Sequence, residues 1–330
     1  MKKATIIILA AFLLIGCLSG CGKGPSPKEQ GDGTISIVTT IFPEYDWVKN
    51  ILGENPAKAE VTMLMDNGVD LHSFQPTAAD ILKISTCDLL IYVGGESDGW
   101  VEDALRGKTN SSMIVIDLLD ILGDAVKEEE VIEGMQEEDH EQEQEEAEEE
   151  YDEHVWLSLK NAEVLVENIS EAVQAIDPEH AETYRKNAAA YVEELNALDG
   201  EYETEVSSAP ARTILFGDRF PFRYLTDDYG LSYYAAFVGC SAETEASFET
   251  ILFLAGKVDE LSLPAVLTIE GSDHRIAETI VQNTQTKDQK ILTMDSMQSV
   301  TKEDAGNGVT YVSLMKDNLA VLREALAGEE

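Results

Sequence analysis

The sequence predicts an α/β fold in which two parallel-sheet lobes are joined by a long helical backbone, with a ligand cleft between the lobes. Short β-branched runs alternate with helical runs in residues 35–117, two long helical runs follow His154, and the alternation resumes at Thr213. Strands that alternate with helices pair in parallel and have both faces covered. Ligands of such sheets bind at the carboxyl ends of the strands.

The first lobe is expected to contain four strands separated by helices. The strands are short and rich in β-branched residues, and cover residues 35–40, 60–65, 89–93 and 113–117. The helices carry apolar residues three and four positions apart, and cover residues 45–52, 77–84 and 100–105. Thr77 follows Pro76 and is expected to cap the second helix. Cys87 stands at the head of the third strand, which predicts a buried free thiol.

The middle of the chain reads as one long, bent helical spine. Its two runs, residues 157–175 and 179–198, are separated by Asp177 as a candidate N-cap and Pro178 at the first helical position. The second lobe then restarts the alternation. Its expected strands are residues 213–216, 233–238, 265–269 and 290–294, and its expected helices are residues 221–228, 248–260, 273–285 and 312–326.

The N-terminus predicts export and a lipid anchor. Two lysines precede a short apolar run, as in a signal peptide, and Leu18-Ser19-Gly20-Cys21 resembles the lipobox of bacterial lipoproteins. That resemblance implies cleavage before Cys21, lipid on its sulfur and an extracytoplasmic, membrane-anchored protein. The expected segments are a signal peptide, a lipidated tether, a first lobe, linking helices and a second lobe, at residues 1–20, 21–34, 35–156, 157–207 and 208–330.

The chain is strongly acidic, with 64 Asp and Glu against 23 Lys and Arg and a net charge of -41. This argues against nucleic acid as a partner, because phosphate binding needs clustered basic residues. Much of the charge falls in an acidic loop, residues 127–153, which ends just before His154. It is interpreted as a solvated loop that can also gather cations. Deleting residues 128–150 is therefore expected to leave the fold and tight metal binding intact.

Three candidate metal ligands follow predicted strands. His72 follows the second strand, His154 follows the fourth strand and the acidic loop, and Asp295 follows the strand at residues 290–294. Two imidazoles and a carboxylate from separate strand ends can bind a divalent transition metal such as Zn²⁺ or Mn²⁺. Because imidazoles bind metal only when neutral, affinity is expected to fall below about pH 6.5.

Several motifs together resemble the metal-type (cluster A-I) substrate-binding proteins of ABC transporters. They are Thr39-Thr40-Ile41-Phe42-Pro43, His72-Ser73-Phe74-Gln75-Pro76-Thr77, Asp152-Glu153-His154-Val155-Trp156-Leu157, Tyr184-Arg185-Lys186-Asn187-Ala188, Asp295-Ser296 and Thr310-Tyr311-Val312-Ser313-Leu314-Met315-Lys316-Asp317-Asn318. The resemblance covers nearly all of the chain after the tether. It implies that His72, His154 and Asp295 are ligands, and that a captured metal is delivered to an ABC permease.

The third family ligand, His or Glu, falls on Arg219, which cannot bind a metal because its guanidinium stays protonated. The candidates to replace it are Asp218, Cys240 and Glu243. Arg219 itself is expected to turn aside and pair with Glu243 or Glu245. Two further histidines are interpreted as surface residues, namely His180 and His274.

The function expected from the resemblance is a monomeric, lipid-anchored receptor for zinc, or second for manganese, which is not an enzyme. A metal-dependent hydrolase is the alternative from another class, but the chain has no His-Glu-x-x-His motif and no Gly-x-Ser-x-Gly motif. An adhesin that uses the outer face, or a receptor whose ligand has changed because of Arg219, also stays open.

Overall fold

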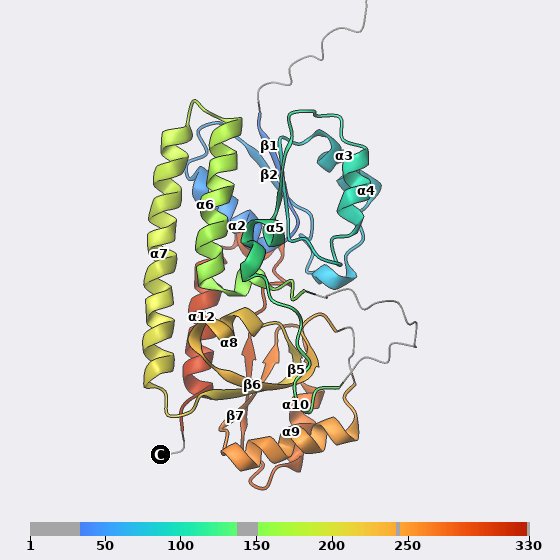
Figure 1. Cartoon of the computed structure of the whole chain (residues 1–330), viewed down its shortest axis with the longest axis vertical. Coiled ribbons are helices and arrows are strands. Elements are labelled where there is room, and N and C mark those ends of the chain that lie inside the picture. Colours follow the sequence, from blue (N-terminus) through green and yellow to red (C-terminus); the bar gives the residue numbers. More distant parts are fainter. Residues whose placement is uncertain (1–33, 137–150, 242–244, 329–330) are drawn as a thin grey trace, which may run out of the picture. The chain divides into compact units, whose positions relative to one another are not determined.

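The structure is a computed structural model that describes residues 34–136, 151–241 and 245–328 (Figure 1). The expected signal peptide, the lipidation site Cys21 and the ligand candidate Glu243 lie outside these ranges. Within them, no helix is both long and apolar enough to cross a membrane.

The first lobe contains a parallel sheet in the order β2-β1-β3-β4. Its strands are β1 (Ser36–Thr39), β2 (Glu60–Met63), β3 (Leu89–Tyr92) and β4 (Ile114–Asp117). Its helices are α2 (Phe42–Leu52), α3 (Ala78–Thr86), α4 (Trp100–Arg106) and α5 (Leu118–Leu122). Ile37 and Val38 point to opposite faces of β1 and both are fully buried, as expected for a sheet covered on both sides. The predicted cap is confirmed, because the Thr77 side chain accepts a hydrogen bond from Asp80 N.

The second lobe repeats this topology with the order β6-β5-β7-β8. Its strands are β5 (Thr213–Phe220), β6 (Ser232–Val238), β7 (Ala265–Ile269) and β8 (Lys290–Met294). Its helices are α8 (Arg223–Tyr229), α9 (Phe248–Leu261), α10 (Arg275–Asn283), α11 (Lys302–Gly306) and α12 (Tyr311–Ala325). Strand β5 is longer than predicted because pairing with β6 resumes at Arg219 after a register shift. Arg219 therefore belongs to a strand, which extends beyond the predicted end at residue 216.

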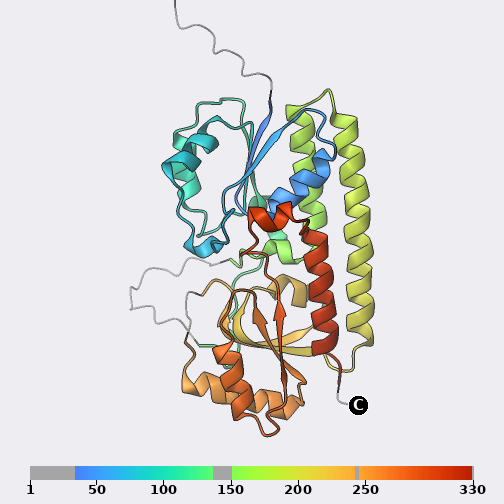
Figure 2. The same ribbon diagram turned by 180° about the vertical axis from the view of Figure 1, so that it is seen from behind.

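Two helices join the lobes, α6 (Leu159–Ile176) and α7 (Ala181–Ser208), and they pack side by side (Figures 1 and 2). The prediction of one bent spine was wrong, because the chain reverses between them. Asp177 ends α6, and its carboxylate accepts hydrogen bonds from Tyr184 Oη at 2.6 Å and His180 Nδ1 at 2.7 Å. Helix α7 contacts α2 of the first lobe and α8 and α12 of the second, so it links both lobes, and α12 also contacts α2 directly.

One hydrophobic core extends through both lobes. It includes Ile37 and Trp47 from the first lobe, and Phe216, Met294 and Tyr311 from the second. A large hinge rotation would expose part of this shared core to water, which opposes such a motion. Cys87 is buried and free, as predicted.

Residues 127–136, which we call the strap, leave the first lobe and run along the second (Figure 1). Lys127 N donates to Tyr224 Oη at 3.0 Å, and Gln136 N donates to Ala236 O on β6 at 2.9 Å. Gly134 lies against the ring of Phe253. The prediction of a solvated loop was therefore wrong for the strap. Hydrogen bonds of its backbone hold it against the second lobe although most of its side chains are exposed or half-buried, while residues 137–150 lie outside the described residues.

Candidate metal centre

His154 lies in the loop that follows the strap and precedes α6, and its side chain is fully buried. Asp152 fixes the ring, since its Oδ1 accepts hydrogen bonds from both His154 N at 2.9 Å and His154 Nδ1 at 3.0 Å. Burial by itself disfavours the charged ring, but the Asp152 carboxylate outweighs it and raises the pKa of His154. With a proton on Nδ1, the Nε2 lone pair is left to bind a metal.

His72 is held in a short 3₁₀ turn (Leu71–Ser73) after β2. Its Nδ1 lies 2.8 Å from Ser97 Oγ and 3.5 Å from Glu153 Oε2, so these groups hold the Nδ1 side of the ring. Burial, followed by the neighbouring His154, lowers the pKa of His72 to about 4. The ring is therefore neutral at neutral pH, which is the state that binds metal.

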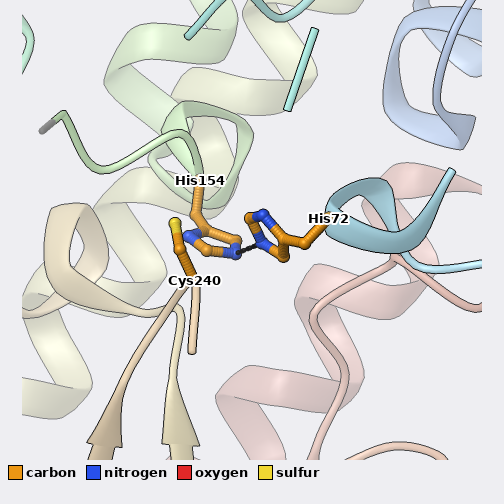
Figure 3. A group of neighbouring side chains, drawn as sticks. All are labelled: His72, His154 and Cys240. Carbon is orange, nitrogen blue, oxygen red and sulfur yellow. Dashed lines mark hydrogen bonds between the residues drawn. The ribbon is translucent and has the colours of Figure 1, made fainter. Parts of the chain in front are cut away.

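The Nε2 atoms of His72 and His154 face each other at 3.3 Å (Figure 3). At this distance one Nε2–H can donate to the Nε2 lone pair of the other ring, and a bound metal would take the place of that shared proton. For zinc–nitrogen bonds of about 2.0 to 2.1 Å, the edge of a tetrahedral site is about 1.6 times longer, or about 3.3 to 3.4 Å. The observed spacing, which is that of a hydrogen bond between the two rings, also suits two ligands on one zinc ion.

Cys240, which follows β6, completes the group from the second lobe (Figure 3). One potential ligand atom from each of His72, His154 and Cys240 lies within 4.8 Å of the other two, and the described residues contain no second group of this kind. Burial, followed by Glu129 of the strap, raises the pKa of the Cys240 thiol. Two imidazoles and a thiol form a donor set typical of zinc.

Arg219 lies beside this group but is turned away to form an ion pair. Its Nη2 donates to Asp70 Oδ2 at 2.9 Å, and its Nη1 donates to Ser241 O at 3.4 Å. Arg219 does pair with a carboxylate, as expected. The prediction of Glu245 as the partner was wrong. Among the described residues, the carboxylate that pairs with Arg219 is Asp70 of the first lobe.

Asp70 has two roles in this arrangement. Its Oδ1 accepts a hydrogen bond from His72 N at 2.9 Å and so caps the 3₁₀ turn, while its Oδ2 binds Arg219. Burial of Asp70 opposes its ionisation, but Arg219 and then His72 outweigh that effect and lower its pKa. Sequence reasoning missed Asp70, although an aspartate two residues before a histidine is a common capping arrangement.

The other ligand candidates are not part of the three-residue group. Asp295 Oδ1 accepts a hydrogen bond from Met297 N at 2.7 Å, and burial together with Glu270 raises the pKa of Asp295 to about 7. Both carboxylate oxygens of Asp218 accept backbone hydrogen bonds, from Arg219 N at 2.9 Å and Ile269 N at 3.3 Å.

His180 and His274 also lie outside the three-residue group. His180 pairs with Asp177 in the turn between α6 and α7. His274 is the N-cap residue of α10.

Gln298 is a further neighbour that sequence reasoning missed. It follows β8, three residues after Asp295, and its Nε2 lies 3.4 Å from His154 Nε2. Its distance in sequence from both histidines gave no signal. Only the folding of the second lobe against the first brings its amide to the site.

The profile of the family described as "Zinc-uptake complex component A periplasmic" matches residues 37–325. The zinc-binding lipoprotein AdcA of Streptococcus pneumoniae is 31% identical over 331 residues, which cover 98% of this chain and 61% of that protein. The chain thus spans about three fifths of the length of this relative. The high-affinity zinc uptake system protein ZnuA of Bacillus subtilis is 30% identical over 322 residues, 97% of this chain and 96% of that protein.

Among solved structures, the Zn(II)-bound ZnuA-like domain of Streptococcus pneumoniae AdcA is similar, with a TM-score of 0.68 and 28% identity over 89% of this chain and 99% of that one. This similarity supports the two-lobe α/β fold. These relatives are named as metal-binding or uptake proteins and not as enzymes, in agreement with the expectation for this chain. The chain belongs to the family of zinc-uptake complex component A proteins.

Proposed function

We propose that this protein is an extracytoplasmic receptor that captures Zn²⁺ between its two lobes and delivers it to an ABC permease. The observation that carries the proposal is the convergence of His72, His154 and Cys240, with Nε2 atoms at the spacing of a tetrahedral zinc edge. The names of the relatives support zinc as the cargo. Each lobe contributes at least one of the three donors, so the metal would lie between the lobes.

The donor set favours zinc over manganese. Manganese prefers carboxylate, carbonyl and water oxygens, whereas a thiol and two imidazoles are soft or borderline ligands that suit zinc. The three-residue group contains no carboxylate. We therefore place manganese second, as a weakly bound competitor.

The lipobox-like sequence at residues 18–21 supports attachment to the membrane through Cys21. We propose that the lipid keeps the receptor close to its permease. Mass spectrometry of the membrane fraction tests this directly. A lipid-modified N-terminal Cys21 is the expected result. Leu14-Ile15-Gly16-Cys17 is a second lipobox-like sequence, and a mature chain that begins at Cys17 or carries no lipid would contradict the proposal.

The zinc proposal is tested by titrating the purified protein with Zn²⁺ and Mn²⁺ against a chromogenic chelator. The wild type is expected to bind one Zn²⁺ much more tightly than Mn²⁺. Replacing the thiol by a hydroxyl in Cys240→Ser should weaken zinc binding and leave manganese binding nearly unchanged. The difference between the zinc and manganese affinities should therefore become smaller. Cys87→Ser, at the other free cysteine, is the control for loss of a thiol elsewhere. Equal affinity for both metals in the wild type would contradict the proposal.

A further inference from the structure

We propose that the side-chain carbonyl of Gln298 provides the fourth zinc ligand. This inference rests on the proposed zinc site, because three donors leave one corner of a tetrahedron to be filled. It assigns that corner to a neutral amide oxygen, which is neither the carboxylate of Asp295 nor a water molecule.

The position of Gln298 is the first argument. Its Nε2 lies 3.4 Å from His154 Nε2, which matches the edge of about 3.3 to 3.4 Å expected between two ligands of one zinc ion. Its backbone is fixed, because Gln298 N donates to Glu270 Oε1 at 3.2 Å. The residue is 7% exposed, so its amide faces the protein interior beside the site.

The second argument is an unsatisfied atom. Gln298 Oε1 is buried and has no hydrogen-bond partner in the described part of the chain. A buried acceptor without a partner costs about 1 to 3 kcal/mol and calls for an explanation. A cation bound beside it would supply the missing interaction.

The third argument concerns His154. Without metal, the Gln298 amide can donate weakly to the His154 Nε2 lone pair at 3.4 Å. Zinc would take that lone pair and leave the amide N–H facing a cation. Rotating the amide by half a turn exchanges nitrogen and oxygen with little change in shape, and directs Oε1 toward the metal. One rotation thus removes a repulsive contact and satisfies the orphan oxygen.

Asp295 is the competing candidate, and its geometry is less favourable. Its Oδ1 is held by Met297 N at 2.7 Å, and Asp295 N is bound to Asn318 Oδ1 at 2.7 Å. Asp295 would have to break a short hydrogen bond to bind with that oxygen. Gln298 needs the amide rotation and loses only a weak contact between its Nε2 and Ser296 Oγ at 3.4 Å.

The experiment uses Co²⁺ as a spectroscopic probe of the zinc site, together with zinc affinity measured by chelator competition. Gln298→Met keeps the length of the side chain and removes the oxygen. We expect weaker zinc binding by about 10- to 100-fold, and a change in the position and intensity of the cobalt d–d bands. Gln285→Met, the same substitution at an exposed glutamine of the second lobe, should change neither. Asp295→Asn should leave the d–d bands nearly as in the wild type.

The cobalt spectrum decides the outcome. Unchanged d–d bands in Gln298→Met overturn the proposal even if affinity falls, because Gln298 would then only support its neighbours. If Asp295→Asn alters the d–d bands and Gln298→Met does not, the fourth ligand is Asp295, and the proposal is also overturned. Failure of the zinc site itself has a different signature, in which the wild type shows no cobalt binding or lacks the near-ultraviolet band of a cobalt–thiolate bond.

Discussion

The two lobes share one strand order, β2-β1-β3-β4 in the first and β6-β5-β7-β8 in the second, but present different chemistry where the strands end. The first lobe and the loop after it bring two imidazoles, each with a carboxylate near its Nδ1. The second brings a thiol, an amide and an arginine. Topology therefore determines where a site forms, and the loops determine which ligand it takes. The following predictions test this division of roles, from the largest expected effect to the smallest.

Removing one of the two imidazoles that the first lobe and its following loop contribute should have the largest effect on zinc affinity. His154→Ala is expected to weaken zinc binding by more than about 100-fold, the upper range for a lost outer-shell partner, because a direct ligand disappears. His180→Ala removes an imidazole that lies between α6 and α7 and should bind zinc as the wild type does. Calorimetry with Zn²⁺ measures both variants. Equal affinities would exclude His154 as a ligand.

The second prediction concerns the strap, which is expected to stabilise the fold through its contacts with the second lobe. Gly134 has a φ of +91°, and a Cβ there would lie 2.0 Å from Phe253 Cδ1. Gly134→Ala should therefore lower the free energy of unfolding by about 1 to 3 kcal/mol, measured by urea denaturation. Gly123→Ala is a matched control, because Gly123 also has a positive φ but a Cβ there meets nothing within 4 Å.

Two deletions test whether the strap, and not the rest of the acidic segment, stabilises the fold. Removing residues 137–150, whose only apolar residue is Ala147, should change the melting temperature little. Removing residues 128–136 should lower it clearly, because the strap binds β6 and packs on Phe253. Equal effects of the two deletions would contradict a structural role that is confined to the strap.

The pair between Arg219 and Asp70 should respond asymmetrically. Asp70→Ala removes the cap of the His72 turn and leaves Arg219 unpaired beside the metal, so zinc affinity should fall by about tenfold. Arg219→Met removes a positive charge near a cation and should leave affinity similar or higher. The double variant should recover part of the loss seen in Asp70→Ala.

A double-mutant cycle on zinc affinity measures this coupling. Equal losses in both single variants, with no recovery in the double variant, would show that Arg219 itself contributes to zinc binding. The natural ligand would then need to be reconsidered.

Glu44 of the first lobe should produce the smallest effect, a change in the slope of stability against pH. Burial, followed by Asp98, raises the pKa of Glu44 from 4.5 to about 8. The folded chain therefore holds a proton that the unfolded chain releases between these pH values. Stability from this group is present below about pH 4.5 and falls by up to about 1.4 kcal/mol per pH unit as pH rises toward 8.

Glu44→Gln cannot ionise and should flatten this slope. Urea denaturation at intervals from pH 5 to pH 8 measures the difference from the wild type. Glu102→Gln, at a side chain that is 82% exposed, should follow the wild-type curve. A Glu44→Gln curve parallel to the wild type would mean that Glu44 is ionised in the folded protein.

The regular elements were accessible from the sequence because their signals are local. Strands β7 and β8 begin and end as predicted, at Ala265–Ile269 and Lys290–Met294. The reversal of the chain at Asp177 could not be predicted from the sequence in the same way. A helix break marks where the direction changes, but whether the chain bends or reverses depends on the packing of α6 against α7.

The sequence by itself determined the two α/β lobes, because strand and helix periodicity are local, and the candidate pair His72 and His154, because the motifs around them resemble those of the family. The tertiary structure decided which side chains of the second lobe meet them, bringing Cys240 and Gln298 to the site and pairing Arg219 with Asp70. The physical reason is that these contacts join residues more than 80 positions apart, and their partners are selected by how two separately formed sheets pack on one core.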